Sequence, residues 1–458
     1  MNRVAHRTTI ALLLVLVLLG GMAMFCVEYV TKGNDWVVFE GNPHLYNGGN
    51  IGTGVITDRD GTMLLSAMDE WIYSDDPMIR QSTIHWLGDR DGYISAPTVA
   101  YYAEEMAGYN LVNGLYAYSD GGGKAQMTLS AQLQKAALEA MGDYRGTVAV
   151  YNYETGEILC AVSTPNYDPD DVPDIDEDDS GAYEGVYLNR FTQVTYVPGS
   201  IFKVVTAAAA LERLNDARDI TFECNGTYEM GADEIVCMRT HGSVDLEDAL
   251  AVSCNCYFAQ LSELLGPDSL QEYVDQFRIT QPLDFDGITT AQGKFQIENA
   301  APVETAWSAI GQHLDLVNPA RFMTFMGVIA GGGKAAEPYV ISQVSSGGHV
   351  KYRAKTTMTD RLMSEETAEE LTELMRNNVT QIYGDGYFPG MSVCAKSGTA
   401  EVGGGKDPNA TFAGFVTDEE YPLAFIAVVE NGGSGSGTCV PIVSDVLIAC
   451  RDYLDSMA

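Results

Sequence analysis

The longest apolar stretch of this chain lies close to its N-terminus. Residues Thr8 to Val27, TTIALLLVLVLLGGMAMFCV, contain no charged side chain over 20 positions. In a helix that rises 1.5 Å per residue, a stretch of this length covers the ~30 Å hydrocarbon core of a bilayer. The pattern therefore predicts one transmembrane helix.

A second pattern, of short apolar runs with strand-like composition, appears at both ends of the remaining chain. GTVAVYN and EILCAVS (146–152 and 157–163) are joined through 154–156 as a hairpin, and three more runs follow far downstream at 391–402, 411–417 and 423–430. Such runs predict a five-stranded, antiparallel sheet. Helical spacing at 127–141 and 441–457, with a long helical insert between the two groups of strands, makes this an α/β (α+β) fold.

The region from 31 to 120 mixes Gly, Asp, Asn and Tyr with short apolar runs such as 54–66 and STIHWLGD at 82–89. We interpret it as a small, strand-rich, membrane-proximal module. The turn-rich stretch YSDGGGKAQ (118–126) is typical of a boundary. The expected organisation is an anchor at 1–30, the module at 31–120 and a large domain at 121–458.

Charge sets the expected orientation of the anchor. Arg3 and Arg7 precede the apolar run and Glu28 follows it, so the positive-inside rule leaves the N-terminus in the cytoplasm and the rest outside. A cleaved signal peptide is the alternative, although no convincing A-x-A site follows the run. Lipidation at Cys26 is a further alternative, although residues 24–26 match the cleavage motif of lipoproteins poorly.

The whole chain is strongly acidic. Its 26 Lys and Arg against 63 Asp and Glu give a net charge of −37, which repels phosphate backbones, so we expect no nucleic-acid partner. The acidic stretch 168–181 lacks the EF-hand pattern and is interpreted as a solvated loop. The glycine runs lack the complete P-loop pattern.

We expect no metal and no cofactor, because the six dispersed histidines form no H-E-x-x-H motif and the chain has no paired C-x-x-C. The nine cysteines are an odd number, so some thiols must stay unpaired. Cys224 and Cys237 flank a short polar segment, and we consider a disulfide between them as a hypothesis.

The first candidate for chemistry is the serine in YVPGSIFKVVTAAAALERL (196–214). Ser200 is expected at a helix start, and Lys203 three residues later is its neighbour on the helix. Apolar neighbours should exclude water and lower the pKa of the lysine, so that neutral Lys203 could take the proton of Ser200. Alone, S-x-x-K also fits a serine N-cap followed by an exposed lysine.

Two further motifs follow in the sequence. Ser253 and Asn255 follow a helical segment, and because residues i and i+2 do not share a helix face, they can converge on one cleft only from a turn. Lys396, Ser397, Gly398 and Thr399 lie in a strand pattern, where glycine permits close approach of another backbone. Helix capping and protection of a strand edge are the ordinary alternatives.

Together, S-x-x-K, S-x-N and K-[ST]-G in this order are typical of penicillin-binding proteins and class A β-lactamases. The chain resembles class B penicillin-binding proteins, the membrane-anchored D,D-transpeptidases of peptidoglycan synthesis. The resemblance extends over nearly the whole chain. Besides the three motifs it includes GVITDRDGTMLL, MTLSAQLQ, TGEILCAVSTPNYDPD, NRFTQVTYVPGSIFK and SAIGQHLDLVNPARF.

The resemblance implies a role for each motif residue. Ser200 would be the acylated nucleophile and Lys203 its base, and the backbone N–H groups of Ser200 and Thr399 would form the oxyanion hole.

Ser253 would pass a proton to the leaving D-alanine and Asn255 would hold the donor peptide and Lys203. Lys396 would tune Ser253 electrostatically. Ser397, Gly398 and Thr399 would bind the donor peptide and its carboxylate.

Three features depart from the family pattern. Ser397 replaces the commoner threonine, and the membrane-proximal module is short. In addition, Cys254 lies inside the S-x-N turn and Cys256 directly follows it. A glycosyltransferase domain would need more chain, so the resemblance implies a separate partner of the SEDS type. The expected ligands are stem peptides ending in D-Ala-D-Ala, an acceptor amine, and β-lactams as covalent inhibitors. The expected location is the bacterial cytoplasmic membrane.

Three other functions stay open at this point: a D,D-carboxypeptidase or β-lactamase, a penicillin sensor, and a non-catalytic scaffold of the cell-wall machinery. No dedicated base for activating water is evident around the motifs, which favours an amine acceptor. Only seven residues precede Thr8, which is too few for a cytoplasmic output domain. The motifs do not indicate whether the role is in elongation, division or sporulation.

Overall fold

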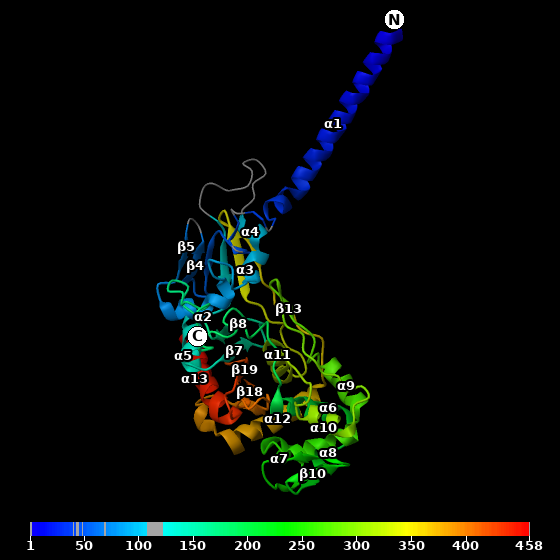
Figure 1. Ribbon diagram of the computed structural model, residues 1–458, viewed down its shortest axis with the longest axis vertical. Coiled ribbons are helices and arrows are strands. Elements are labelled where there is room, and N and C mark those ends of the chain that lie inside the picture. Colours follow the sequence, from blue (N-terminus) through cyan, green and yellow to red (C-terminus); the bar gives the residue numbers. More distant parts are fainter. Residues whose placement is uncertain are drawn as a thin grey trace.

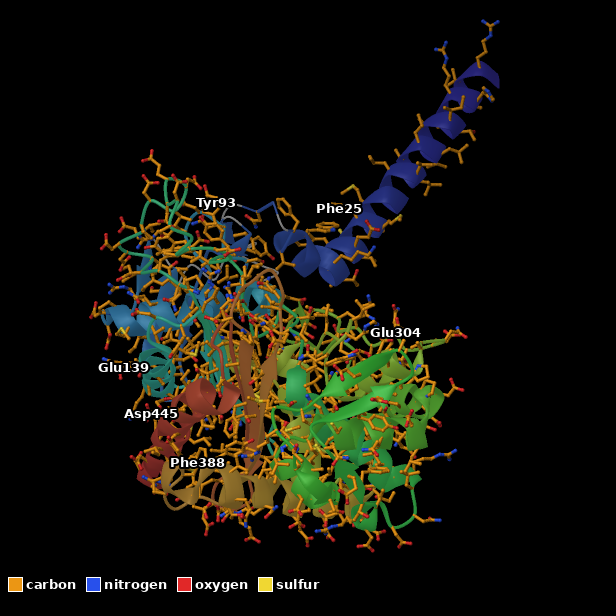
Figure 2. All side chains as sticks on the ribbon, turned by 60° about the horizontal axis from the view of Figure 1, so that its bottom comes forward. Phe25, Tyr93, Glu139, Glu304, Phe388 and Asp445 are labelled. Atoms are coloured by element: carbon orange, nitrogen blue, oxygen red, sulfur yellow. The ribbon has the colours of Figure 1, made fainter. Side chains whose placement is uncertain are left out.

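The computed structural model describes residues 2–39, 41–42, 45–47, 49–67, 70–107 and 122–457. A long helix, α1 (Asn2–Val37), projects from the body of the protein (Figure 1). Its stretch Arg3–Gly33 is long and apolar enough to cross a membrane, a property that signal sequences share. Figure 2 labels Phe25 on this projecting helix. The predicted apolar helix is therefore present, and it extends beyond the predicted run at both ends.

The region after α1 contributes strands to a six-stranded sheet of order β16-β15-β6-β3-β4-β5. Two short strands, β1 and β2, form a separate pair. The strands are β1 (Tyr46–Asn47), β2 (Asn50–Ile51), β3 (Val55–Thr57), β4 (Met63–Ala67), β5 (Trp71–Tyr73), β6 (Lys124–Met127), β15 (Ile341–Ser346) and β16 (His349–Arg353).

Three helices accompany this sheet: α2 (Pro77–Leu87), α3 (Pro97–Tyr101) and α4 (Ala103–Ala107). The expectation that the region is mainly strand is wrong for most of STIHWLGD, which lies in α2. Asp76 accepts a hydrogen bond from the backbone N–H of Met78, and Pro77 occupies the first helical turn. Both are helix-start signals, and they outweigh the β-like composition of the run.

Of the turn-rich boundary segment predicted at 118–126, residues 118–121 lie outside the described residues, and 124–126 belong to β6. Strand β6 pairs in parallel with β3, and Ala125 lies opposite Ile56. The helix predicted from residue 127 begins only at Ala131, as α5 (Ala131–Met141), because Met127 still belongs to β6 and Ser130, the N-cap, has an extended backbone.

The second sheet has the predicted five strands, all antiparallel, in the order β17-β18-β19-β7-β8. Two come from the beginning of the large domain and three from its end, as the apolar runs predicted. Their bounds are β7 (Gly146–Asn152), β8 (Ile158–Thr164), β17 (Val393–Ala400), β18 (Asn409–Val416) and β19 (Leu423–Val429).

Helices cover both faces of this sheet (Figure 1). Alternate strand residues point to opposite faces, so Phe412 and Phe425 pack with α5 and α13 (Gly435–Met457), whereas Ala413 and Ile426 pack on the side of α11 (Pro319–Ala330). The strands consequently carry apolar side chains on both faces, which is why they appear in the sequence as continuous apolar runs.

The insert between β8 and β17 is mostly helical, as expected. Its helices are α6 (Lys203–Arg213), α7 (Leu246–Ala251), α8 (Asn255–Leu265), α9 (Pro267–Gln276), α10 (Pro302–Ala309), α11 and α12 (Glu365–Asn378). Single helical turns are η1 (Gly199–Phe202), η2 (Ala217–Asp219), the π-helical η3 (Val379–Tyr383) and η4 (Asp385–Tyr387). Small antiparallel pairs are β9 (Phe222–Cys224) with β12 (Gly242–Val244), β10 (Thr227–Met230) with β11 (Asp233–Val236), and β13 (Asp284–Phe285) with β14 (Ile288–Thr289).

Candidate active site

Ser200 lies in the tight turn η1, immediately before α6. Gly199 has φ +60° and donates its N–H to the carbonyl of Gly311 at 2.8 Å. A Cβ at Gly199 would lie only 2.7 Å from the carbonyl oxygen of Thr399 in β17. Only glycine satisfies both conditions, so this turn can lie directly against the strand that carries the third motif.

Lys203 begins α6 and its side chain is completely buried. Its ammonium donates hydrogen bonds to the carbonyl oxygen of Ser253 at 2.8 Å, the hydroxyl of Ser253 at 3.1 Å and Oδ1 of Asn255 at 2.6 Å. Burial disfavours the charged form and lowers the pKa of Lys203 to about 8, although nearby cysteine sulfurs oppose the shift. A pKa this close to neutral pH suits a general base.

The turn between α7 and α8 presents both polar residues of the second motif to Lys203. Ser253 has φ +56°, the left-handed conformation that is uncommon for residues other than glycine. Asn255 then begins α8 and donates its Nδ2 to the carbonyl of Val236 at 2.8 Å, while Oδ1 accepts from Lys203. The expected convergence of Ser253 and Asn255 from a turn is thus present.

The third motif lies in β17 beside these groups. Lys396 is 1% exposed, and its ammonium donates to the carbonyl oxygen of Ser397 at 2.9 Å. Burial, and then the charge of Lys203, hold the pKa of Lys396 well below its usual value. Gly398 contacts the serine turn so closely that a Cβ there would lie 2.9 Å from the carbonyl oxygen of Pro198.

The structure thus brings Lys203, Ser253 and Asn255 into direct contact and places β17 against the turn that carries Ser200. Among the described residues, the hydrogen bonds of Lys203 go to the Ser253 turn and none goes to Ser200. Thr399 is exposed at the open side of the strand, and its hydroxyl accepts a hydrogen bond from the N–H of Gly435 at 3.4 Å.

The sequence analysis missed Tyr383, a partner of the third motif. Its phenol accepts a hydrogen bond from the N–H of Ser397 at 2.8 Å and lies 2.9 Å from the hydroxyl of the same residue. Tyr383 ends the π-helical turn η3, and such turns frequently occur at functional sites. No local motif marks this tyrosine, because its contact with Ser397 is made by tertiary packing.

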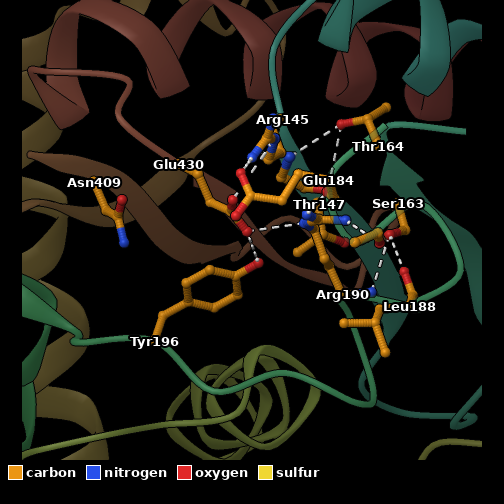
Figure 3. A network of polar contacts seen from close by, with 12 residues as sticks. Arg145, Thr147, Ser163, Thr164, Glu184, Leu188, Arg190, Tyr196, Asn409 and Glu430 are labelled. Atoms are coloured by element: carbon orange, nitrogen blue, oxygen red, sulfur yellow. Dashed lines mark hydrogen bonds and ion pairs between the residues drawn. The ribbon is translucent and has the colours of Figure 1, made fainter. Parts of the chain in front are cut away.

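A buried polar network holds the segment that leads to Ser200 (Figure 3). Glu430, which follows β19, accepts hydrogen bonds from Nε of Arg190 at 2.8 Å and from the hydroxyl of Tyr196 at 2.9 Å. The Arg190 side chain is only 4% exposed. The network connects the end of the central sheet to Tyr196, four residues before Ser200. It therefore holds the segment that leads into the serine turn in place.

The hypothesis of a disulfide between Cys224 and Cys237 is not supported. Within the described part of the chain, all nine cysteines are unpaired thiols. Instead, Cys224 and Cys237 lie in a group with His241 and Cys254 that could hold a metal ion. This group matches neither C-x-x-C nor H-E-x-x-H, because its four residues are spread over 224–254.

Comparison with known proteins gives the class of the molecule. The family model "Penicillin binding protein transpeptidase domain" matches residues 146–447, from the first strand of the central sheet into its last helix. The chain belongs to this family. The resemblance inferred from the three motifs, and the mixed α/β transpeptidase fold that it implied, are both confirmed.

Named relatives and solved structures agree with this assignment. The chain is 29% identical over 372 residues to the peptidoglycan D,D-transpeptidase PbpA of Mycolicibacterium smegmatis, covering 74% of each protein. It is 29% identical to stage V sporulation protein D of Bacillus subtilis, covering 73% of this chain and 52% of that one. The D,D-transpeptidase domain from Eggerthella lenta matches with TM-score 0.75 and 24% identity over 88% of this chain and 98% of its own.

Proposed function

We propose that the protein is a peptidoglycan D,D-transpeptidase that cross-links stem peptides through a serine acyl-enzyme. The observation that carries the proposal is the buried Lys203, held by Ser253 and Asn255 beside a serine turn that lies against β17. A buried amine of lowered pKa beside hydroxyl groups can act as the general base that activates a nucleophile. The relatives named as D,D-transpeptidases support the same chemistry.

In the first half-reaction, neutral Lys203 takes the proton of Ser200, whose oxygen attacks the carbonyl between the two D-alanines. The backbone N–H groups of Ser200 and Thr399 stabilise the oxyanion that develops, and each such donor contributes roughly 2.7–4 kcal/mol in other enzymes. The close packing of the serine turn on β17 supports this role, since it brings the two backbones together.

Collapse of this intermediate releases the terminal D-alanine. Ser253, whose hydroxyl is in contact with Lys203, passes a proton to the leaving amine, and Asn255 holds the donor peptide and the lysine. Lys396, whose ammonium interacts electrostatically with Lys203, tunes Ser253 through its charge. Ser397 and Thr399 bind the terminal carboxylate, while the peptide pairs along the strand at Gly398.

In the second half-reaction, an amine of another stem peptide attacks the ester and restores Ser200. The bond lost in the donor is thereby replaced by a new amide, without any external energy source. β-Lactams enter through the same acylation step and remain attached as an ester. Penicillin-binding protein A from Mycobacterium tuberculosis, which is similar in fold, has been solved as a penicillin G acyl-enzyme complex.

We further propose that α1 anchors the protein in the bacterial cytoplasmic membrane, with Arg3 and Arg7 inside and the catalytic domain outside. The proposed organisation keeps the anchor at 1–30, the membrane-proximal module at 31–120 and the transpeptidase domain at 121–458. A SEDS-type glycosyltransferase would supply the glycan strands, contacted through the anchor and the module.

The test begins with intact-mass measurement of the full-length protein after incubation with penicillin G. One added penicillin mass, mapped to the peptide containing Ser200 and absent in Ser200→Ala, is the expected result. Attachment elsewhere, or no attachment in a folded protein, would contradict the proposal and favour a scaffold.

Transfer is distinguished from hydrolysis by adding a stem-peptide analogue together with an acceptor amine. We expect a cross-linked product and one free D-alanine for each product molecule. Free D-alanine with only hydrolysed peptide would identify a carboxypeptidase, and rapid turnover of penicillin would identify a β-lactamase.

A further inference from the structure

Four potential metal ligands lie together behind the Ser253 turn. Cys224 ends β9, Cys237 follows β11, His241 precedes β12 and Cys254 precedes α8. Their sulfur atoms and one ring nitrogen all lie within 4.8 Å of one another. The three cysteines are buried and the histidine is half-buried. These residues therefore form a compact, mostly enclosed group of three thiols and one imidazole.

Two of the six distances between ligand atoms match those expected around a tetrahedral ion, and all six are within 4.8 Å. Zinc ligands at about 2.3 Å for sulfur and 2.0–2.1 Å for nitrogen are roughly 3.4–3.8 Å apart. The sulfur of Cys224 lies 3.4 Å from Nδ1 of His241, and the sulfurs of Cys237 and Cys254 lie 3.7 Å apart. A disulfide needs about 2.05 Å between sulfurs, so the described arrangement is that of separate ligands.

The backbone around the group is arranged to stabilise thiolates. The N–H of Cys256 donates to the sulfur of Cys237 at 3.3 Å, and the N–H of Tyr257 donates to the sulfur of Cys254 at 3.4 Å. Both N–H groups belong to the first turn of α8, where the helix dipole also favours negative charge. Hydrogen bonds to coordinating atoms of this kind orient ligands and tune the metal.

The positions of the ligands are also fixed by strand pairing. Cys224 pairs with Gly242 in the β9–β12 ladder, and the N–H of His241 donates to the carbonyl of Cys224 at 3.2 Å. The N–H of Cys237 donates to the carbonyl of Gly226 at 2.8 Å. The ligands therefore come from backbone that is already ordered, which lowers the conformational cost of binding an ion.

We propose that Cys224, Cys237, His241 and Cys254 bind one Zn²⁺ ion as a closed structural site. Three thiols lose their protons to solvent when the ion binds, and the imidazole coordinates as the neutral base. Soft sulfur ligands with one imidazole, in a tetrahedral arrangement, favour zinc over hard cations. With four protein ligands, no coordination position remains for substrate, so the ion takes no part in the transfer of the acyl group.

The consequence for catalysis is positional. Cys254 lies between Ser253 and Asn255, and Cys237 follows Val236, whose carbonyl accepts the hydrogen bond from Asn255. An ion that joins Cys237 to Cys254 therefore ties together the two segments that orient Asn255. It also holds the turn in which Ser253 adopts φ +56°. Loss of zinc should release this turn from Lys203.

The proposal is tested first by metal analysis of the full-length protein purified without chelators. We expect about one zinc per chain, and loss of that zinc in Cys224→Ala. The matched control is Cys256→Ala, which removes the nearest cysteine outside the group and retains the N–H that donates to Cys237. The control should keep its zinc.

A second measurement is independent of whether Cys224→Ala folds. The unaltered chain, stripped with a strong chelator under reducing conditions, is reconstituted with Co²⁺. Bands typical of tetrahedral cobalt bound to thiolates are expected, and zinc should abolish them. Absence of both zinc and these bands would overturn the proposal, as would a disulfide between any two of the three cysteines in the unreduced protein.

Acylation by a fluorescent penicillin then connects the ion to the active site. Removal of zinc should slow acylation at least about tenfold, and restored zinc should recover the rate. A zinc-containing protein whose acylation is unaffected by chelation would refute the positional role. Because metal content is measured without any substrate, failure of the zinc proposal can be distinguished from failure of the proposed transpeptidase function.

Discussion

The ammonium nitrogen of Lys203 lies 2.6 Å from Oδ1 of Asn255, although the two residues belong to different helices and are 52 positions apart. Both side chains occupy the first turn of their helices, α6 and α8. Apolar packing of these helices brings the two turns together, so the core of the insert determines the geometry of the proposed base.

Replacement of Lys203 by alanine should slow acylation strongly while leaving the protein folded. General-base catalysis typically contributes 10²- to 10⁴-fold, so we expect the acylation rate with fluorescent penicillin to fall by about that factor. Lys334→Ala, at an exposed lysine, is the matched control and should react normally. Normal acylation of Lys203→Ala would show that another group activates Ser200.

The acylation rate should depend on pH through Lys203. Because burial lowers its pKa to about 8, the reactive neutral form makes up about a tenth of the enzyme at pH 7. The rate should rise close to tenfold per unit below this pKa and level off above it. Stopped-flow acylation between pH 6 and about 9.5 measures the profile. A flat profile would contradict a lysine base of lowered pKa.

Gly398→Ala should prevent the close approach of β17 to the serine turn. The added Cβ would lie 2.9 Å from the carbonyl oxygen of Pro198 and would overlap the hydroxyl of Thr411. We expect acylation to fall at least about tenfold, with a loss of stability of about 1–3 kcal/mol from overpacking. Gly386→Ala, where a Cβ has open space, should change neither property.

Glu430→Gln should weaken the network that leads to Ser200, because it removes the charge opposite the buried Arg190. We expect the free energy of unfolding to fall by about 1–3 kcal/mol. The exposed pair of Arg361 and Glu365 provides the control, since Glu365→Gln should cost less than about 1 kcal/mol. Chemical denaturation of both variants checks the difference, and equal losses would contradict the role assigned to Glu430.

The central sheet could be predicted because each of its strands is buried on both faces and therefore appears as an apolar run. The motif residues could be predicted because Ser200 with Lys203, and Ser253 with Asn255, are close in sequence and depend on local turns. Their contacts with one another required the structure, since packing of α6 on α8 produces them.

Other features had no local signal that the sequence analysis could use. Tyr383 reaches Ser397 from a π-helical turn, and the four metal-ligand candidates are separated by 12, 3 and 12 intervening residues. The run at 82–89 has β-like composition, but Asp76 and Pro77 before it start a helix. In that case the helix-start residues, which were available in the sequence, were the better guide.

Strands β15 and β16 come from the insert, yet they complete the sheet nearest the projecting helix by pairing with β6. The polypeptide thus returns to this sheet between Asn255 and Lys396. A shortened protein that begins at residue 124 would retain β6, β15 and β16 but lose β3, β4 and β5, leaving a row of unsatisfied backbone groups on one side of β6. Self-association through that uncovered edge is the hazard for any soluble fragment made in this way.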